Sequence, residues 1–405
     1  MHSQNLVWAK QISGTDLNRG TAIALDASGN VYTLGVYRGT ADFDPGVGVF
    51  NLTAKGNNDI FISKSNAAGD LIWALSMGDS AYDFGTSIAI DQSGNIYTTG
   101  CFSDIADFDP GTGIFNLTAV GSYDIFISKI DSSGNFVWAK QMGSPDFDFA
   151  YALALDDFGN VYSTGYFTDS ADFDPGAGIF TMTSSGGRNV FISKLDSDGN
   201  FIWAKQFNGT GDDNCTAIKA DALGNIYMTG VFNSTTDFDP GVLNYDLTSM
   251  GLNDNFIAKL DSSGNFQWAK QIGESGVDGA LGLTLDHSAN VITTGTFNGM
   301  CDFDPGAGTY NLTTIGNSDI YVSMLDSAGN FIWAKQMGGT ANEYGAAITV
   351  DVSGNIYITG VFVGTCDFDP GSGIFNLNSS ASSIDLFISK LDPSGNFQWA
   401  LPFGG

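Results

Sequence analysis

Short apolar stretches separated by turn signals run along the whole chain. The first clear example is an apolar segment at residues 21–25, followed by D-A-S-G-N at 26–30 and a return segment at 31–35. Such a run between β-branched residues is typical of a hairpin, because glycine supplies a positive φ and aspartate caps the turn. No segment shows the 3.6-residue period of a helix. The pattern therefore predicts antiparallel strands joined by tight turns.

A second hairpin follows in each unit after a longer loop. An apolar strand at residues 60–64 leads into this hairpin, whose clearest copy is D-S-S-G-N at 131–135. The next strand carries a tryptophan, and residues 50–53 predict a short β excursion within the loop. Each unit thus predicts four main strands. The tryptophans are Trp8, Trp73, Trp138, Trp203, Trp268, Trp333 and Trp399.

One five-residue element, D-F-D-P-G, occurs once in each unit. It begins at Asp42, Asp107, Asp172, Asp237, Asp302 and Asp367, always 65 residues apart. A constant period marks one repetitive object rather than unrelated domains. We predict an all-β fold, a six-bladed β-propeller with four main antiparallel strands in each blade of about 65 residues, and a single domain over residues 1–405.

The two ends of the chain predict how the propeller closes. There are seven tryptophan strands for six D-F-D-P-G elements, because residues 5–11 and 396–401 both carry one. A propeller closes when a strand from one terminus completes the blade made by the other. We therefore expect one of these terminal tryptophan strands to close the ring.

Composition and charge narrow the classes of partner. Charged residues make up only 15% of the chain and aromatic residues 13%, which excludes a disordered, charge-rich protein. The net charge of −29 repels phosphate backbones and anionic lipid, so we expect no nucleic-acid partner. No apolar run approaches the ~20 residues of a membrane span, so we expect no membrane insertion. The strongly acidic surface favours the binding of cations.

Lysine and cysteine point to packing rather than to a ligand site. Lysines recur in two repeat columns, which suggests contacts between blades and ion pairs. The four cysteines do not form an obvious framework, and we predict four free thiols. The two lysine columns are Lys64, Lys129, Lys194, Lys259 and Lys390, and Lys10, Lys140, Lys205, Lys270 and Lys335.

Two motifs carry a family resemblance. Units of the form G-x-A-I-A-L-D-x-S-G-N-I-Y-T-T-G and D-I-F-I-S-K-L-D-S-S-G-N-F-x-W-A-K-Q resemble bacterial SBBP-type β-propeller repeats, which are distantly similar to NHL repeats. The D-F-D-P-G insertion makes these units longer than is typical. The resemblance implies a secreted or cell-surface protein, often part of a larger modular chain. Met1-His2-Ser3 is no signal peptide, so we expect a native signal to have been removed.

The resembled blade order places two kinds of loop on one face. Loops that follow the tryptophan strand and loops between the second and third strands both open there, and both are acidic. The hairpin aspartates, such as Asp26 and Asp131, lie on the other face and are interpreted as turn caps. The acidic column after the tryptophan strand comprises Asn18, Asp83, Asp148, Asp213, Asp278 and Glu343.

The D-F-D-P-G loops are candidate Ca²⁺ sites. Asp42 and Asp44 supply carboxylates two residues apart in a glycine-rich loop, a usual partial ligand set for Ca²⁺. The pattern lacks the third acid and the late glutamate of an EF-hand. In the alternative interpretation the aspartates only shape the turn, Phe43 packs between blades and Pro45 holds Asp44 extended. The candidate ligands are Asp42, Asp44, Asp107, Asp109, Asp172, Asp174, Asp237, Asp239, Asp302, Asp304, Asp367 and Asp369.

Nothing in the sequence forms a recognisable catalytic constellation. The only histidines are His2 and His287, and there is no nucleophile elbow, H-E-x-x-H motif or phosphate-binding loop. The tryptophan column could stack on sugars, but large aromatics more often fill a core. The sequence thus predicts no enzyme.

The prediction is a non-catalytic, exported binding or adhesion scaffold, stabilised by Ca²⁺ at its acidic loops. Its partner would be a carbohydrate or protein ligand at the acidic loop face. One alternative is a hydrolase or lyase that acts on polysaccharide through paired carboxylates. Another is a purely structural module of a larger surface protein.

Overall fold

The computed structural model describes residues 7–380 and 383–404, and these contain β-strands without an α-helix. They fall into two compact units. One comprises residues up to Thr183 together with Ile192–Ala204, and the other comprises Ser184–Phe191 and the residues from Lys205 onward. The boundary runs through two strands of the third repeat, β18 and β19. A single domain over the whole chain stays a prediction.

Each repeat contributes four long strands, as the hydrophobic pattern predicted. The first are β2 (Asn18–Leu25), β8 (Asp83–Ile90), β14 (Phe149–Leu155), β20 (Asn214–Ala220), β26 (Gly279–Leu285) and β32 (Tyr344–Val350). The second are β3 (Val31–Tyr37), β9 (Ile96–Phe102), β15 (Val161–Phe167), β21 (Ile226–Phe232), β27 (Val291–Phe297) and β33 (Ile356–Val363).

The third and fourth strands follow the D-F-D-P-G loop. The third are β6 (Asp59–Ser65), β12 (Asp124–Ile130), β18 (Asn189–Leu195), β24 (Asp254–Leu260), β30 (Asp319–Leu325) and β36 (Ile384–Leu391). The fourth, which carry the tryptophans, are β7 (Leu71–Met77), β13 (Phe136–Met142), β19 (Phe201–Gly209), β25 (Phe266–Ile272), β31 (Phe331–Gly339) and β37 (Phe397–Phe403).

A short strand pair forms the predicted β excursion in each repeat. The pairs are β4 (Thr40–Asp42) with β5 (Asn51–Thr53), β10 (Ile105–Asp107) with β11 (Asn116–Thr118), and β16 (Ser170–Asp172) with β17 (Thr181–Thr183). They continue with β22 (Thr235–Asp237) and β23 (Asp246–Thr248), β28 (Met300–Asp302) and β29 (Asn311–Thr313), and β34 (Thr365–Asp367) and β35 (Asn376–Asn378). A further short strand, β1 (Ser13–Gly14), pairs with β4.

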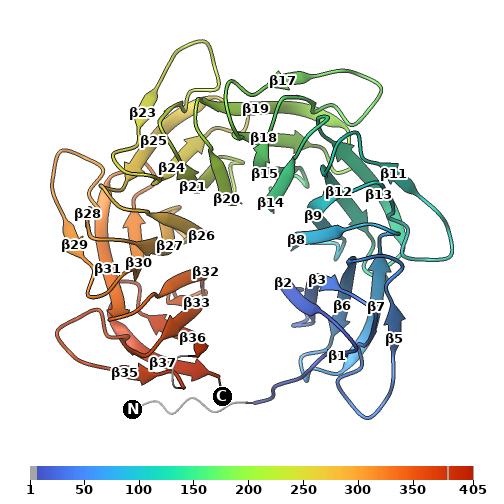
Figure 1. Ribbon diagram of the computed structural model, residues 1–405, viewed down its shortest axis with the longest axis horizontal. Coiled ribbons are helices and arrows are strands. Elements are labelled where there is room, and N and C mark those ends of the chain that lie inside the picture. The colour runs from blue at the N-terminus through green and yellow to red at the C-terminus, as the bar shows by residue number, and fades with distance from the viewer. Residues whose placement is uncertain (1–6, 381–382, 405) are drawn as a thin grey trace. The chain divides into compact units, whose positions relative to one another are not determined.

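The long strands form antiparallel meanders in chain order. In the first unit the sheets run β2-β3-β6-β7 and β8-β9-β12-β13. In the second unit β20-β21-β24-β25 and β32-β33-β36-β37 repeat this order, and β26-β27-β30-β31 does so with β34 and β35 added. Within a unit, Figure 1 shows each short pair beyond its tryptophan strand, for example β5 beside β7.

Burial of both sheet faces explains why the central strands are almost wholly apolar. All seven residues of β9 and of β12 are buried. Within a unit, the first strand of one repeat packs against the first strand of the next, as β8 does against β2 and β14. Each small sheet therefore buries its faces only by stacking on its neighbours, as expected for a repeat protein.

The hairpins of the repeats are closed by aspartate, except the second hairpin of the first repeat, where Asn66 takes this place. In the first hairpin, Asp26 accepts hydrogen bonds from the amides of Ser28 and Asn30, both at 2.9 Å, and Gly29 adopts φ +79°. The positive φ is where glycine avoids the strain of a side chain. The prediction that these aspartates are turn caps is confirmed, and the side-chain hydrogen bond from Asn355 lowers the pKa of Asp351 to about 2.

The segment predicted as the first tryptophan strand differs from its counterparts. Residues 7–12 have no strand structure, and residues 5 and 6 lie outside the described part. Trp8 nevertheless donates its indole N–H to the carbonyl oxygen of Ala67 at 3.1 Å. Trp138 makes the equivalent bond to Ser197 at 3.2 Å from within β13. Because the segment has no third strand beside it, the tryptophan contact forms without the sheet.

Candidate functional site

Both aspartates of each D-F-D-P-G loop hold backbone amides. Oδ1 of Asp42 accepts hydrogen bonds from the amides of Asp44 at 3.0 Å and Phe50 at 2.8 Å. Oδ1 of Asp44 accepts from the amide of Gly46 at 2.8 Å. These bonds tie both ends of the loop to its first residue. The turn-shaping role weighed for the aspartates is therefore present in the structure.

The same hydrogen bonds recur in every later copy. The first aspartate accepts from amides two and eight residues further on, and the second from the glycine amide. The first aspartates are Asp107, Asp172, Asp237, Asp302 and Asp367, and the second are Asp109, Asp174, Asp239, Asp304 and Asp369.

The fit of these loops to a metal ion is limited. Within residues 7–380 and 383–404 no group of three or more His, Cys, Asp or Glu side chains converges as a metal site. One oxygen of each loop aspartate is already held by amides, which leaves at most one oxygen per carboxylate for a cation, and that of Asp107 lies 3.5 Å from Lys55 Nζ. Ca²⁺ takes six to eight oxygens, so most of its ligands would have to be water.

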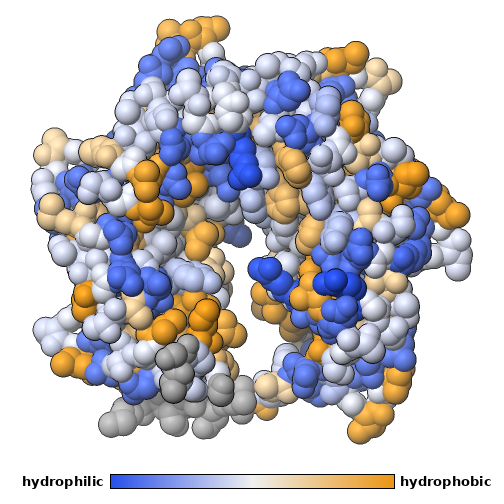
Figure 2. Space-filling view, viewed as in Figure 1, coloured by the Kyte–Doolittle hydropathy of each residue, from blue (hydrophilic) through white to orange (hydrophobic). Residues whose placement is uncertain are grey.

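A phenylalanine anchors each loop, and five of the six loops leave a large apolar side chain exposed near the tip. Phe43 is buried and packs edge-on against Tyr37, with ring centroids 5.5 Å apart. Val47 and Val49, which follow it, are exposed. Figure 2 shows hydrophobic side chains on several protruding segments. We call the exposed residues of these loops the loop tips: Val47, Val49, Ile114, Ile179, Val242, Leu243 and Ile374.

The acidic column after the tryptophan strand is buried rather than displayed on a face. Asp148 accepts hydrogen bonds from the amides of Ser144 and Thr168, so it joins the loop after the tryptophan strand to the loop after the second strand. This confirms that the two kinds of acidic loop lie together. Burial raises the pKa of Asp83 to about 8, of Glu343 to about 7 and of Asp148 to about 6.

A second buried acid lies beside this column, and the sequence analysis did not identify it. Asp124, at the start of β12, accepts from the amides of Val120 and Gly121 and from the side chain of Gln141. A Cβ on Gly143 would lie 2.5 Å from its carboxyl carbon, so glycine is needed there. Burial raises the pKa of Asp124. The recurrence of aspartate at the start of the third strand was the available signal.

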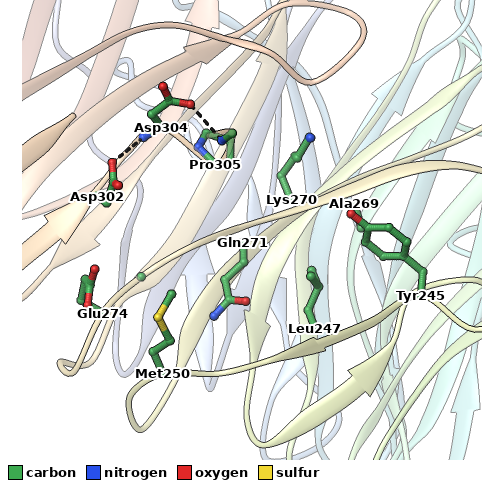
Figure 3. A pocket seen from close by; sticks show the side chains of 12 residues that line it. Tyr245, Leu247, Met250, Ala269, Lys270, Gln271, Glu274, Asp302, Asp304 and Pro305 are labelled. Atoms are coloured by element: carbon green, nitrogen blue, oxygen red, sulfur yellow. Dashed lines mark hydrogen bonds between the residues drawn. The ribbon is translucent and has the colours of Figure 1, made fainter. Parts of the chain in front are cut away.

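In the second unit, a groove of about 290 Å³ opens between the β23–β25 region of one repeat and the loop after β28 of the next. Figure 3 shows the carboxylates of Asp302, Asp304 and Glu274 on one side of it and Lys270 on the other. Tyr245 also lines it. The groove therefore presents acidic and basic side chains beside the D-F-D-P-G loop that begins at Asp302.

The lysine and tryptophan columns have structural roles. Lys64 lies 4.9 Å above the ring of Tyr32 and 3.8 Å from Asp26, and Lys129 donates to the carbonyl oxygen of Ser197 in the next repeat at 2.9 Å. The predictions of ion pairs and of contacts between repeats are confirmed by these residues. Trp73 packs edge-on against Tyr32 at 5.9 Å, which supports a packing role for the tryptophans.

The four cysteines are buried and free. They are Cys101, Cys215, Cys301 and Cys366. Burial raises the pKa of Cys101 and of Cys301 well above the usual thiol range, which opposes formation of the reactive thiolate.

Within the described residues, no helix is long and apolar enough to cross a membrane.

The antiparallel meanders and their repeats define an all-β protein of the β-propeller class. Residues 72–100, 137–174, 202–239 and 332–361 match the family model of the SBBP beta-propeller repeat. These four stretches of the chain therefore carry the SBBP beta-propeller repeat, as its motifs predicted. Each match begins in a tryptophan strand and runs into the following repeat.

Two curated proteins show similarity to the chain. The uncharacterized WD repeat-containing protein L264 of Acanthamoeba polyphaga mimivirus is 25% identical over 483 residues, covering 98% of this chain and 34% of that protein. The regulatory protein FlaEY of Caulobacter vibrioides is 24% identical over 220 residues, covering 53% of this chain and 22% of that protein. The chain thus spans well under half the length of either relative.

A solved structure is also similar to the chain. It is described as a protein of unknown function from Bacteroides caccae, with a TM-score of 0.41 and 10% sequence identity. The match covers 84% of this chain and 89% of that chain.

Proposed function

We propose that the protein is a non-catalytic, exported binding or adhesion scaffold whose contact surface is formed by the D-F-D-P-G loops. The observation that carries the proposal is the repeated loop design. Each loop is fixed by the same amide bonds to aspartate, as at Asp42 and Asp44, and several present an exposed valine, isoleucine or leucine. An exposed apolar side chain on a fixed turn costs little entropy when it binds.

Repetition makes weak contacts effective. Each loop tip can bury only one or two side chains, so a single loop binds weakly. Several loops that meet one extended ligand gain avidity, because later contacts form at a high effective concentration. An extended carbohydrate or a repetitive protein surface is the kind of partner that fits. A catalytic site, in contrast, is needed only once.

The buried acids support a structural role over hydrolysis. A retaining or inverting glycosidase needs two carboxyl groups that reach the substrate. Asp83 and Asp148 have raised pKa values, but both are fully buried and hold loop amides. A turnover assay on polysaccharides should accordingly give no product.

We further propose that the repeats close as a six-bladed propeller, with one of the terminal tryptophan segments completing the ring. Six repeats of constant period support this. Trp8 also contacts the first repeat as Trp138 contacts the third. Small-angle X-ray scattering tests closure, since an open arc has a larger radius of gyration than a ring.

Ca²⁺ at the loop aspartates remains a hypothesis, motivated by the spacing of the paired carboxylates and by the second oxygen of aspartates such as Asp42, which accepts none of the loop amide bonds. A secreted or cell-surface location is likewise proposed from the family resemblance. Fractionation of the native host tests the location. Recovery of the protein only in the cytoplasm would contradict it.

A comparison of two sets of variants tests the loop surface. In the first, Val49, Ile114, Ile179 and Ile374 are each replaced by Ser. The matched control replaces Leu223 and Val352, which are 77% and 90% exposed in hairpin turns away from the loops. Binding to a glycan array and to intact cells of the host should fall about tenfold or more in the loop variant alone. Equal binding by both variants would contradict the proposal.

A further inference from the structure

A row of aromatic side chains crosses from the second repeat to the third within the first unit. We call Tyr82, Phe84, Tyr123 and Phe147 the aromatic row. The rings of Tyr82 and Phe84 are parallel within 3°, with centroids 6.4 Å apart. Phe84 lies 6.2 Å from Tyr123, and Tyr123 stacks on Phe147 at 5.8 Å. The four rings therefore form one continuous set of contacts.

The two end rings are open to solvent. Tyr82 is 41% exposed and Phe147 is 46% exposed, while Phe84 and Tyr123 are partly buried. The residues around them are polar, and Ser80, Ser122 and Asp146 are all exposed. Large rings bury more area than most side chains, so leaving them exposed gives up stability that a core position would gain.

The aromatic row departs from the repeat. The columns of Tyr82 and Phe84 carry rings in both the second and the third repeat, but Asp212 and Asn214 stand there in the fourth. Residues needed by every sheet recur in every repeat, as Phe43 and its equivalents do. The positions equivalent to Tyr82 are Leu17, Phe147, Asp212, Val277 and Asn342. The row is therefore a local feature, which folding of the other repeats does not require.

The backbone beneath the rings is fixed. The amide of Tyr82 donates to the hydroxyl of Ser103 at 3.2 Å, and the amide of Phe147 donates to that of Thr168 at 3.2 Å. Tyr123 and Phe147 also form a parallel β-bridge. A surface held in this way loses little conformational entropy when a ligand binds.

We propose that the aromatic row binds a neutral saccharide chain. The proposal rests on the binding function proposed above and names its ligand class. The face of a pyranose ring presents C–H groups, which pack favourably on the negative face of an aromatic ring. Sugar hydroxyls would pair with the exposed Ser80, Ser122 and Asp146. Centroid spacings of 5.8 to 6.4 Å resemble the length of one sugar unit.

Charge and shape argue for this ligand class. A net charge of −29 repels sulfated and uronic-acid polymers but not neutral ones. A stable protein partner needs a broad contact, of order 1,200 Å² or more in total. The aromatic row is one ring wide, and fully buried carboxylates, Asp83 and Asp148, alternate with its rings along the chain. A narrow strip of rings, with a 50° tilt between Phe84 and Tyr123, suits a linear sugar chain better.

The experiment titrates the full chain with neutral oligosaccharides of glucose, mannose and N-acetylglucosamine and measures binding by calorimetry. We expect at least one series to bind, with affinity that rises with chain length. Tyr82→Ala and Phe147→Ala should each weaken it about tenfold. Tyr82→Phe keeps the ring and should stay within about threefold of the parent protein. The control is Phe158→Ala, because Phe158 is 76% exposed in a hairpin turn.

The outcomes separate this site from the loop surface. Saccharide binding that needs the rings but not the loop tips supports the row even if the loop proposal fails. Binding that is lost only in the loop variant overturns the aromatic site. Absence of binding to every neutral series at about millimolar concentration, with melting unchanged in the variants, also overturns it. Binding only to anionic polymers or only to a protein would do the same.

Discussion

Trp138 donates its indole N–H to the carbonyl oxygen of Ser197 at 3.2 Å and thereby ties the last strand of the second repeat to a hairpin of the third. Its ring also packs edge-on against Tyr97 at 6.1 Å. A Cβ on Gly199 would lie 3.1 Å from the indole, so the tryptophan covers the turn closely. The contact joins adjacent sheets, whose stacking stabilises a repeat protein.

Replacing Trp138 by Phe should therefore destabilise the first unit. The variant loses the indole hydrogen bond and part of the buried area, at a cost of about 1–3 kcal/mol in the free energy of unfolding. Urea titration followed by tryptophan fluorescence measures the change. Val137→Ala is the control, because Val137 is 45% exposed on the same strand and should change stability by about 0.5 kcal/mol or less. Equal effects of the two substitutions would contradict this role.

Stability should fall as the pH rises from about 5 to about 9. The pKa of Asp83 is raised from 3.8 to about 8 and that of Glu343 from 4.5 to about 7, both by burial. A raised folded-state pKa gives stability that is complete below the unfolded value and is lost as pH rises through the folded value. The hairpin aspartate Asp351 affects the pH dependence of stability in the opposite direction, because its pKa is lowered to about 2. Its contribution is lost only as pH falls below about 4.

Melting temperatures across this range, with Asp83→Asn as the matched variant, check the pH prediction. Asn18 occupies the equivalent position in the first repeat, so the amide is compatible with the fold. The variant should lose less stability than the parent protein between about pH 6 and 9. A parent melting temperature that is constant from acid to alkali would refute it.

The Ca²⁺ hypothesis separates cleanly from the turn-shaping role by substitution at Asp42. Asp42→Asn keeps an oxygen that can accept from the amides of Asp44 and Phe50, but it removes the charge that a cation needs. Asp42→Ala removes both and should cost about 1–2 kcal/mol. If Ca²⁺ binds, excess Ca²⁺ raises the melting temperature and EDTA lowers it. Because the Asn substitution alters one loop of six, the melting temperature of that variant should then change slightly less with either reagent than that of the parent protein. A melting temperature that neither Ca²⁺ nor EDTA changes would contradict the hypothesis.

The four thiols should be inert in the folded protein. Cys101, Cys215, Cys301 and Cys366 are all buried, and burial raises the pKa of Cys101 and Cys301. Only the thiolate reacts quickly with disulfide reagents. We expect a chromogenic disulfide to detect all four thiols in denaturant and almost none in native buffer. Rapid reaction of any thiol in native buffer would show that its repeat opens.

The sequence predicted local structure well because that structure depends on local chemistry. The D-x-S-G-N turns place aspartate and glycine where amide caps and a positive φ are required, and Asp26 and Gly29 fulfil both roles. The strand predicted at residues 5–11 is wrong over its described part, residues 7–11. Its pattern matches the other tryptophan strands, but a strand also needs a neighbour with which to pair, and no pattern supplies one.

Some features of the candidate site could also be predicted from the sequence, and others could not. The aspartates at Asp42 and Asp44 could be named from spacing, and their amide bonds follow from residues two to eight positions away. Burial of Asp83 could not be read from the chain, since the acidic column looks like a surface feature. The aromatic row was missed for the same reason. Phe84 and Tyr123 become neighbours only when the sheet of the second repeat forms, and Tyr123 meets Phe147 only when adjacent repeats stack.

By itself, the sequence determined the repeat, the strand order and the chemistry of the turns, because each depends on residues close together in the chain. The tertiary structure decided which acids are buried and whose pKa values rise, because desolvation depends on what packs around a carboxyl group. It also decided which apolar residues remain exposed. Only packing in the folded repeat separates Phe43, which is buried against Tyr37 and Phe61, from Val47, which is left exposed at the tip.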